Sequence, residues 1–411
     1  MTVFLSSWVS LAQAEKKGTL VVCAQCPIKT ISQAVHSAHK GDTILVKAGE
    51  YEEETLSIKT TVHLIGEEGA TLIHRGEGDM ILVTAPDTTI KGLKIIGSGK
   101  STYQDFSAVK IANTSGCRIV DNEIVDSQYG VMVANSTHCV VSGNTITTKA
   151  VASGLQGDGI HFWKTSDSKI TGNRVQGHRD GIYLEFSTDG EIFDNVITNN
   201  HRYGLHFMFA NDNEFRNNIF RSNDAGVAVM YSKRIRMLRN EYSDNAGAAS
   251  YGLLLKDITA SEITENEFLG NTVAIFMEGS NRNRFFLNRF DKNGWTIRLL
   301  SSCESNVFQN NAFLNNALAV ATNSHLNLNT FQQNYWAQHK NVDLDHNGYA
   351  DLPYQPTSFS SFLLEKHNVS ILLVGSPVLK LLDWAEQMFP AISPVSLKDP
   401  MPLMNFPLRK R

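Results

Sequence analysis

The sequence predicts an all-β protein: a right-handed parallel β-helix solenoid with an N-terminal cap helix and a C-terminal helical docking segment. The first observation behind this prediction is an asparagine that recurs beside short β-type segments, at successive spacings of 22, 29, 22, 23, 22, 26, 22, 23 and 23 residues. The second is another short segment in each repeat, in which apolar residues occupy alternate positions. A period near 22 is too short for helical-pair repeats and is typical of one β-helix coil.

The recurring asparagine marks one corner of each coil. We expect it to adopt the left-handed backbone conformation, which Asn tolerates, and to hydrogen-bond to the coils above and below. The two long intervals predict loop insertions before Gly159 and Gly252. The column consists of Asn122, Asn144, Asn173, Asn195, Asn218, Asn240, Asn266, Asn288, Asn311 and Asn334.

The second segment of each repeat begins at a small residue such as Gly159, Gly181 or Gly204. Counted from this small residue, the first and third positions that follow are apolar and are predicted to point inward. The second and fourth positions are therefore predicted to point outward. One predicted outward column contains Met132, His161, Tyr183, His206, Ala228 and Leu254, and the other contains Ala134, Trp163, Glu185, Met208, Met230 and Lys256.

The N-terminal region contains two predicted features. Residues 28–39 (IKTISQAVHSAH) are amphipathic and predict the helix that caps the open end of the solenoid. We place the solenoid itself at residues 15–340. Residues 1–14 contain an apolar run followed by Ala12-Gln13-Ala14, a pattern that signal peptidases cut. No Lys or Arg precedes Lys16, so the basic start of a signal peptide is missing and an irregular tail is the alternative.

The C-terminal region is divided between a polar turn at residues 341–357 and a helical segment with a tail at residues 358–411. The helical segment has a broad apolar stripe, which predicts either a cap on the second open end or docking on a membrane partner. The tail is expected to be disordered or partner-bound. The stripe residues that we assign to partner binding are Leu381, Trp384, Met388 and Phe389.

Composition excludes several classes of protein. Hydrophobic residues make up 42% of the chain and charged residues 19%, which argues against general disorder. The 37 basic and 41 acidic side chains give a net charge of −4, so nucleic acid is not an expected partner. No apolar run reaches the roughly 18 residues of a membrane-spanning helix.

The outward columns gather imidazole and thioether side chains on one flat sheet. His161, His206, Met208 and Met230, with Glu185 beside them, form a ligand set suited to Cu(I). The alternative is a protein-docking or covered face, because Met and aromatic side chains are common at interfaces. For that alternative the contact residues are Trp163, Tyr183 and Phe209.

The cysteines leave several alternatives open. Cys23 and Cys26 form a C-x-x-C motif before the cap helix, which predicts a disulfide, a stiffener of the cap or a transient copper pair. Cys117 and Cys139 occupy one turn column in consecutive coils, where either a disulfide or stacked free thiols would fit. Cys303 has no evident partner.

The polar turn has the spacing of a calcium loop. Asp343, Asp345, Asn347 and Asp351 stand at the first, third, fifth and ninth places, and Gly348 at the sixth. The twelfth place holds Tyr354 instead of a bidentate Glu. A structural Ca²⁺ and a metal-free Asx-rich turn are therefore both open.

Particular sequence strings resemble the NosD family, the periplasmic accessory proteins of nitrous oxide reductase maturation. They are GDGIHFWKTSDSKITGNRVQGHRDGIYLEFS, YGLHFMFANDNEFRNN, NYW with DLDHNGYADLPYQP, and LDWAEQMFP with LKDPMPLM. The resemblance covers roughly residues 20–404 and carries over His161, His206 and Met208 by position.

This resemblance implies a non-enzymatic role in an ABC-transporter complex whose membrane subunit and cytoplasmic ATPase are other chains. It implies assembly of the copper–sulfide centre of nitrous oxide reductase, with copper supplied by a lipoprotein chaperone. The location implied is the periplasm, at the inner membrane through these partners.

Two other classes remain as alternatives. One is a carbohydrate-active β-helix, an epimerase or a polysaccharide lyase, for which His178, Arg179, Asp180 and Glu185 would be the candidates. We place Asp180 and Glu185 on different elements, which weakens the case for a hydrolase because it needs two carboxylates in one cleft. The other class, a surface adhesin, would usually lack the apolar C-terminal helix.

Overall fold

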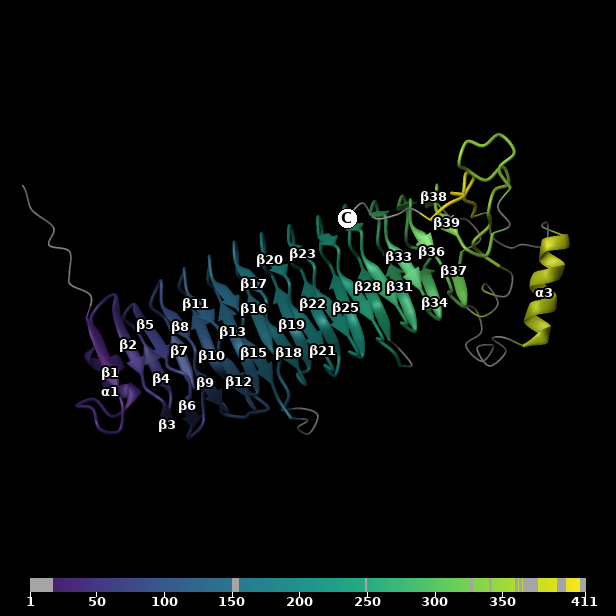
Figure 1. The fold of residues 1–411 in the computed structure, drawn as a ribbon. Helices are drawn as coiled ribbons and strands as arrows, with labels where there is room; N and C mark the ends of the chain where they lie inside the picture. The colour runs from purple at the N-terminus through teal and green to yellow at the C-terminus, as the bar shows by residue number, and fades with distance from the viewer. Residues whose placement is uncertain are drawn as a thin grey trace, which may run out of the picture.

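The computed structural model describes residues 18–149, 155–247, 250–324, 328–339, 342–358, 361, 364, 376–389 and 397–406. Within them the chain forms a long parallel β-solenoid whose coils add strands in turn to three sheets (Figure 1). The predicted fold class is confirmed. The expected signal peptide at residues 1–14 lies outside the described residues.

The three parallel sheets are named A, B and C. Sheet A consists of β1 (Thr19–Val22), β2 (Asp42–Val46), β5 (Val62–Gly66), β8 (Thr89–Lys91), β11 (Arg118–Val120), β14 (Val140–Ser142), β17 (Lys169–Thr171), β20 (Glu191–Phe193), β23 (Glu214–Arg216), β26 (Arg236–Leu238), β29 (Glu262–Thr264), β32 (Arg284–Phe286), β35 (Val307–Gln309) and β38 (Thr330–Gln332). Sheet B consists of β3 (Gly49–Glu53), β6 (Ala70–His74), β9 (Lys94–Ile96), β12 (Glu123–Val125), β15 (Thr145–Thr147), β18 (Arg174–Gln176), β21 (Val196–Thr198), β24 (Ile219–Arg221), β27 (Glu241–Ser243), β30 (Glu267–Leu269), β33 (Arg289–Asp291), β36 (Ala312–Phe313) and β39 (Tyr335–Trp336). Sheet C consists of β4 (Leu56–Ile58), β7 (Ile81–Val83), β10 (Ser107–Ala112), β13 (Tyr129–Ala134), β16 (Ile160–Trp163), β19 (Asp180–Glu185), β22 (Tyr203–Met208), β25 (Ala225–Met230), β28 (Tyr251–Lys256), β31 (Val273–Glu278), β34 (Trp295–Leu299) and β37 (Leu318–Thr322).

The recurring asparagine lies at the corner between sheets A and B and is buried in every coil. Its side chain both accepts and donates: Asn195 donates its backbone N–H (3.0 Å) and its Nδ2 (2.9 Å) to Oδ1 of Asn218. The predicted ladder is thus present, but the predicted left-handed asparagine is wrong. The left-handed residue is the one before it, such as Asp194 or Asn217, because the ladder requires the asparagine itself to point inward.

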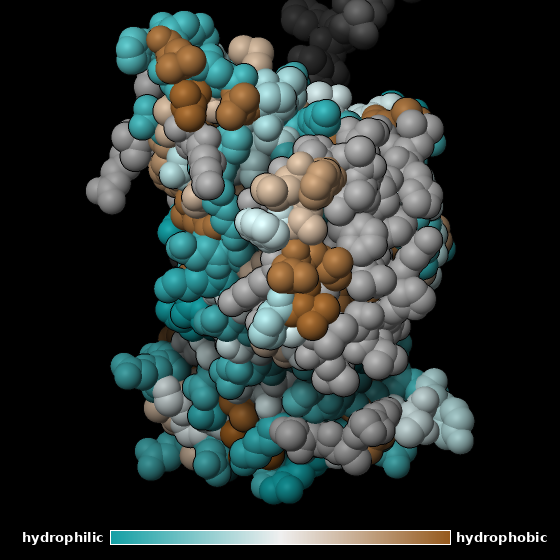
Figure 2. Space-filling model, turned by 90° about the vertical axis from the view of Figure 1, so that its right-hand side faces the viewer, coloured by the Kyte–Doolittle hydropathy of each residue, from teal (hydrophilic) through white to brown (hydrophobic). Residues whose placement is uncertain are grey.

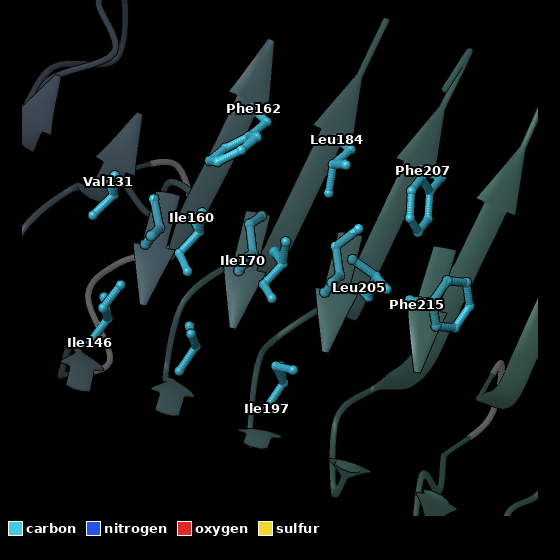
Figure 3. Close-up of a cluster of buried hydrophobic side chains, with 14 of the residues drawn as sticks. Val131, Ile146, Ile160, Phe162, Ile170, Leu184, Ile197, Leu205, Phe207 and Phe215 are labelled. Carbon is cyan, nitrogen blue, oxygen red and sulfur yellow. The ribbon is translucent and has the colours of Figure 1, made fainter. Parts of the chain in front are cut away.

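The core is formed by the inward residues of all three sheets. Aliphatic side chains fill the N-terminal coils, and Figure 3 shows the middle of the rod, where phenylalanines such as Phe162 and Phe207 join aliphatic residues such as Ile170. Toward the C-terminus aromatic rings take their place and stack between coils, at centroid distances of 4.3 Å for Phe285–Phe308 and Phe308–Phe331. Identical side chains in successive coils pack in register because the coil repeat equals the strand spacing.

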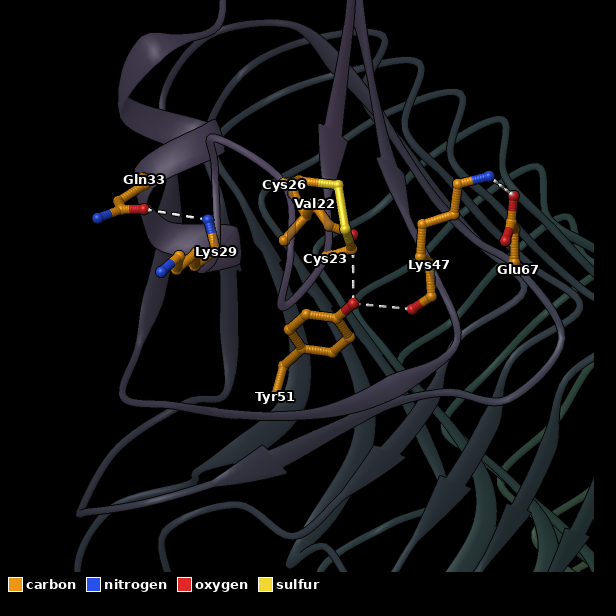
Figure 4. Close-up of a disulfide and its surroundings, with 8 residues drawn as sticks. All are labelled: Val22, Cys23, Cys26, Lys29, Gln33, Lys47, Tyr51 and Glu67. Atoms are coloured by element: carbon orange, nitrogen blue, oxygen red, sulfur yellow. Dashed lines mark hydrogen bonds and ion pairs between the residues drawn. A yellow bond between two sulfur atoms is a disulfide. The ribbon is translucent and has the colours of Figure 1, made fainter.

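The cap helix α1 (Ile31–Ser37) covers the N-terminal end of the core with Ile31 and Ala34. The buried carboxylate of Glu53 accepts the backbone N–H of Ile31 (2.6 Å), which satisfies a helix N-terminus that has no preceding turn. Beside it, Cys23 and Cys26 form a disulfide, which decides among the alternatives left open for this pair (Figure 4).

The C-terminal end is closed by a returning segment, residues 397–406, that we call the clasp. Single antiparallel bridges join Tyr349 to Leu403 and Tyr354 to Asp399. Asp399 is fully buried and its carboxylate accepts the N–H of Asn334 (2.9 Å), so it takes the place of the next asparagine in the ladder. The expectation of a disordered tail is therefore wrong for residues 397–406, which are held by these contacts, and the alternative of a partner-bound tail stays a prediction.

Helix α3 (Pro377–Met388) lies between the last coil and the clasp in the sequence, at the C-terminal end of the rod (Figure 1). Leu382 packs against a small cluster on the edge of sheet C. Figure 2 views this end and shows hydrophobic side chains at its surface. Among the described residues no helix is long and apolar enough to cross a membrane.

Candidate functional site

The candidate site lies on the outer face of sheet C, on strands β16, β19, β22 and β25. Their register places His161, Tyr183 and His206 in one column. The parallel column contains Trp163, Glu185, Met208 and Met230. Both columns agree with the alternation in the sequence.

The histidine column is more buried than an outward column suggests. His161 is 8% exposed and His206 5%, and the ring of Tyr183 stacks between them at centroid distances of 4.6 and 4.5 Å. The two imidazoles therefore do not face each other, and one metal ion cannot bind both in this arrangement. Tyr183 is itself 8% exposed, so it offers a partner little contact surface.

The methionine column is half-buried. The Tyr183 hydroxyl donates to Sδ of Met208 at 3.5 Å, and Met230 lies beside Met208 in the next coil. Glu185 pairs in register with Met208. Trp163 lies at the N-terminal end of the column, with the Lys164 ammonium 4.4 Å from its ring centroid.

Two buried carboxylates lie behind the histidine column. The sequence analysis did not identify them as a pair. Asp158 and Asp180 are both fully buried, one coil apart, and each is clamped by an arginine from the following coil. Arg179 reaches Asp158 with Nε and one terminal nitrogen, both at 3.2 Å. Arg202 clamps Asp180 in the same two-pronged way, with Nε at 2.7 Å.

Each carboxylate also lies beside a histidine. Nδ1 of His206 is 3.2 Å from Asp180, and Nδ1 of His161 is 3.4 Å from Asp158. The signal that could have revealed this network is the repeated Asp-Gly-Ile string at residues 158–160 and 180–182, with Arg179 directly before the second copy.

Burial sets the electrostatics of this network. It raises the pKa of Asp158 to about 7, with the nearby charge of Asp180 adding to the effect. Burial also favours the neutral form of Asp180, but hydrogen bonds from Arg202 and His206 outweigh it and hold the pKa of this carboxyl below its ordinary value. Desolvation lowers the pKa of His161 to about 4.

An aromatic ladder forms the corner next to the methionine column. Phe186, Phe209 and Tyr231 are 45%, 40% and 39% exposed and stack at centroid distances of 5.3 and 5.1 Å. All three have left-handed backbone, with φ of 51°, 52° and 52°. The same corner holds Asn113 and Asn135 in earlier coils, residues that tolerate this conformation. Phe209 was expected as a contact residue, whereas Tyr231 was not identified from the sequence.

The carbohydrate-active alternative can be compared with this geometry. Asp180 and Glu185 lie on the same strand, β19, so our placement of them on different elements is wrong. They nevertheless stand at opposite ends of that strand, and both members of the closer pair, Asp158 and Asp180, are fully buried under side chains. His178 is also fully buried.

The other candidates lie apart from this face. Cys117, Cys139 and Cys303 are buried free thiols, which decides the alternative left open for the first two. In the polar turn, Asp343 accepts the backbone N–H groups of Asn347 (3.1 Å) and Gly348 (3.0 Å).

The remaining bonds of that turn follow the same pattern. Asp351 accepts the N–H of Leu344 (2.7 Å), and Asp345 accepts the Nδ2 of Asn347 (2.8 Å). These bonds are those of an Asx-rich turn. No cluster of three or more His, Cys, Asp or Glu side chains suited to a metal occurs in the described part of the chain.

The predicted partner residues of α3 are exposed. Leu381, Trp384 and Met388, with Phe389 directly after the helix, are between 57% and 66% exposed, and Val378 on the helix is 60% exposed.

Comparisons with known proteins give a consistent assignment. A family model described as "Periplasmic copper-binding protein (NosD)" matches residues 142–349. A protein of Stutzerimonas stutzeri named "Probable ABC transporter binding protein NosD" is 30% identical over 383 residues, covering 88% of this chain and 87% of that protein. One of Pseudomonas aeruginosa with the same name is 30% identical over 379 residues, with the same coverage.

Solved structures support the fold alone. The Dettilon tailspike protein superposes with a TM-score of 0.58 at 15% identity, covering 70% of this chain and 64% of the tailspike chain, which is less than two thirds of its length. A family 28 exopolygalacturonase of Yersinia enterocolitica gives a TM-score of 0.54 at 11% identity, covering 77% of each chain.

Proposed function

Because the chain belongs to the NosD family of periplasmic copper-binding proteins, we propose that it is an accessory subunit of an ABC-transporter-type complex that matures nitrous oxide reductase. In this role it supports assembly of the copper–sulfide centre of the reductase, by copper transit, by docking of the client enzyme, or by both. The chain itself performs no bond chemistry. Its partners are a transporter membrane subunit with a cytoplasmic ATPase, a copper chaperone lipoprotein and the reductase.

The observation that carries this proposal is the aromatic ladder beside the methionine column. Left-handed backbone costs roughly 1–2 kcal/mol for a residue with a side chain. Three consecutive coils nevertheless hold exposed aromatic rings there, at Phe186, Phe209 and Tyr231. Left-handed residues recur at corners along the described solenoid, so it is the exposed rings that distinguish these coils, and exposed aromatic rings are typical of protein contacts.

The copper part of the proposal rests on the adjacent thioethers. Met208 and Met230 lie in register on neighbouring strands about 4.8 Å apart, and His206 is two residues from Met208 on the same face. Thioether and imidazole are ligands that favour Cu(I). A copper ion passing from a chaperone to a client would meet them next to the surface on which the partner docks.

Docking on the transporter is assigned to α3. Its exposed Leu381, Trp384 and Met388 recur every three to four residues, which is the spacing of a helix that binds in an apolar groove. On this proposal the chain is held at the inner membrane by its partners through this helix.

The test is the copper content of nitrous oxide reductase purified from cells that carry a fourfold variant, in which His161, His206, Met208 and Met230 are replaced together. The reductase is expected to lack its copper–sulfide centre, although the variant protein is present at the normal level. A fully loaded reductase would overturn the copper part of the proposal. A second variant, L381A/W384A, is expected to release the protein from purified transporter; retained binding would overturn the role of α3.

A further inference from the structure

His206 makes a hydrogen bond through a ring nitrogen, whereas His161 makes none with the described residues. Nδ1 of His206 lies 3.2 Å from Oδ2 of Asp180, at hydrogen-bond distance. Asp180 is fully buried, its carboxylate is clamped by Arg202 through two nitrogens, and its Oδ1 also accepts the backbone N–H of Tyr203 (3.3 Å). The carboxylate is therefore fixed in position before any ligand arrives.

This arrangement selects one tautomer of His206. A carboxylate paired with arginine has no proton to donate, so the contact with Nδ1 is satisfied only if Nδ1 carries the hydrogen. One guanidinium nitrogen of Arg202 also lies 3.4 Å from Nδ1 and has a second hydrogen, but the contact of Nδ1 with the Asp180 carboxylate is shorter, at 3.2 Å, and is charge-assisted, so it decides the tautomer. With the hydrogen on Nδ1, Nε2 holds a free lone pair.

Nε2 of His206 is also an unexplained polar atom. It is buried, and none of the described residues gives it a hydrogen-bond partner. A buried nitrogen without a partner is unfavourable and calls for an explanation such as a missing ligand. The soft thioethers of Met208 and Met230 lie on the same face of the same sheet.

The pair formed by His161 and Asp158 lacks such a hydrogen bond. Its 3.4 Å contact does not have hydrogen-bond geometry, and both ring nitrogens of His161 are without a partner among the described residues. The ring of Tyr183 separates His161 from His206. Of these two histidines, His206 is the one that combines a fixed tautomer with nearby thioethers.

We propose that Asp180 is a positioning residue that holds His206 with its Nε2 lone pair available to Cu(I), and that Arg202 fixes Asp180 for this purpose. This inference rests on the copper part of the proposed function. Carboxylates that hydrogen-bond to a ligating histidine orient its ring and set its tautomer, and their loss typically lowers metal affinity 10–100-fold.

The decisive variant is Asp180→Asn, which keeps the shape of the side chain. The new amide donates to Nδ1 of His206, which moves the ring hydrogen to Nε2 and removes the lone pair. Two measurements follow this change: anaerobic Cu(I) titration against a competing chelator, and ¹⁵N NMR of histidine-labelled protein. His206→Ala identifies the His206 resonance.

A matched control is Asp291→Asn. Asp291 is also a buried carboxylate, 6% exposed and paired with Arg289, but it lies in sheet B in a distant coil. It should leave both the Cu(I) affinity and the His206 resonance unchanged.

The expected result is a wild-type spectrum with a hydrogen on Nδ1 of His206, a D180N spectrum with a hydrogen on Nε2, and a Cu(I) affinity that D180N lowers about 10–100-fold. A wild-type His206 protonated at Nε2 would overturn the inference even if D180N failed to fold. Wild-type affinity in D180N would also overturn it. If the wild-type protein took up no Cu(I), the copper part of the proposed function would fail, and with it this role of Asp180.

Discussion

Replacing Asp399 with alanine is expected to release the clasp from the end of the solenoid. The carboxylate of Asp399 accepts the backbone N–H of Gln333 (3.0 Å), the backbone N–H (2.9 Å) and Nδ2 (3.0 Å) of Asn334, and the Nε1–H of Trp336 (3.0 Å). Trp336 is 1% exposed, so these donors are shielded from water while the clasp is docked.

The size of the effect follows from these contacts. Each buried donor left without an acceptor costs about 1–3 kcal/mol, so four donors would cost roughly 4–12 kcal/mol if they stayed dry. The clasp would undock and admit water before the larger figure was reached. We therefore expect a local destabilisation of about 4–5 kcal/mol, confined to the C-terminal end.

Hydrogen exchange measured by mass spectrometry would check this prediction. Peptides covering residues 349–354 and 397–404 should lose protection in D399A, while peptides from the central coils keep theirs. Asp399→Asn should give an intermediate loss of protection. The asparagine amide keeps one oxygen that can accept, but its NH₂ group faces N–H donors and cannot accept from them. Wild-type protection of the clasp in D399A would refute the reasoning.

Three further predictions concern other parts of the chain. Burial lowers the pKa of His178 to about 4, so the unfolded chain takes up a proton first as the pH falls from about 6.5, and folding stability should drop between pH 6.5 and 4. A second ladder of buried asparagines runs through Asn200, Asn223, Asn245, Asn271, Asn293 and Asn316. His178 occupies the place before it and donates its backbone N–H to Asn200, so His178→Asn should remove up to about 3 kcal/mol of this acid sensitivity in urea unfolding at the two pH values; an unchanged pH profile would contradict it. The double variant F209N/Y231N should keep the free energy of unfolding within about 1 kcal/mol of wild type, because relief of backbone strain offsets the lost ring stacking. The same variant should bind the client or the chaperone more weakly in a pull-down assay. Unaltered binding would argue against the docking surface. Replacing both Cys23 and Cys26 with serine should cost roughly 2 kcal/mol at most in thermal unfolding, because the disulfide closes a very short loop; a much larger loss would contradict this account.

Much of the fold could be predicted because its repeat leaves a periodic trace. Alternation of apolar residues identified the inward and outward columns of sheet C, and the strand register agrees with them at His206, Met208 and Met230. The corner asparagine was recognised by its spacing, but its backbone conformation was not. The left-handed corner position and the ladder position are adjacent in the chain, and asparagine suits both. The spacing alone therefore does not show which of the two positions the recurring asparagine occupies.

The candidate site was predicted only in part. The sequence placed the histidines and methionines on one face, but it could not show that Tyr183 separates His161 from His206 or that Asp180 lies behind His206. These contacts depend on the side-chain conformations of residues on β16, β19 and β22, which are set by the packing of three neighbouring coils.

The sequence by itself determined the coil period, the composition of the inward and outward columns and the exposed apolar stripe of α3. The tertiary structure decided which polar side chains are buried together and how the rod is closed. Asp399 shows the reason: it lies 65 residues after Asn334 in the chain yet completes its ladder. An inner rung must both donate and accept, which suits asparagine, whereas the last rung meets only donors, and a carboxylate satisfies them.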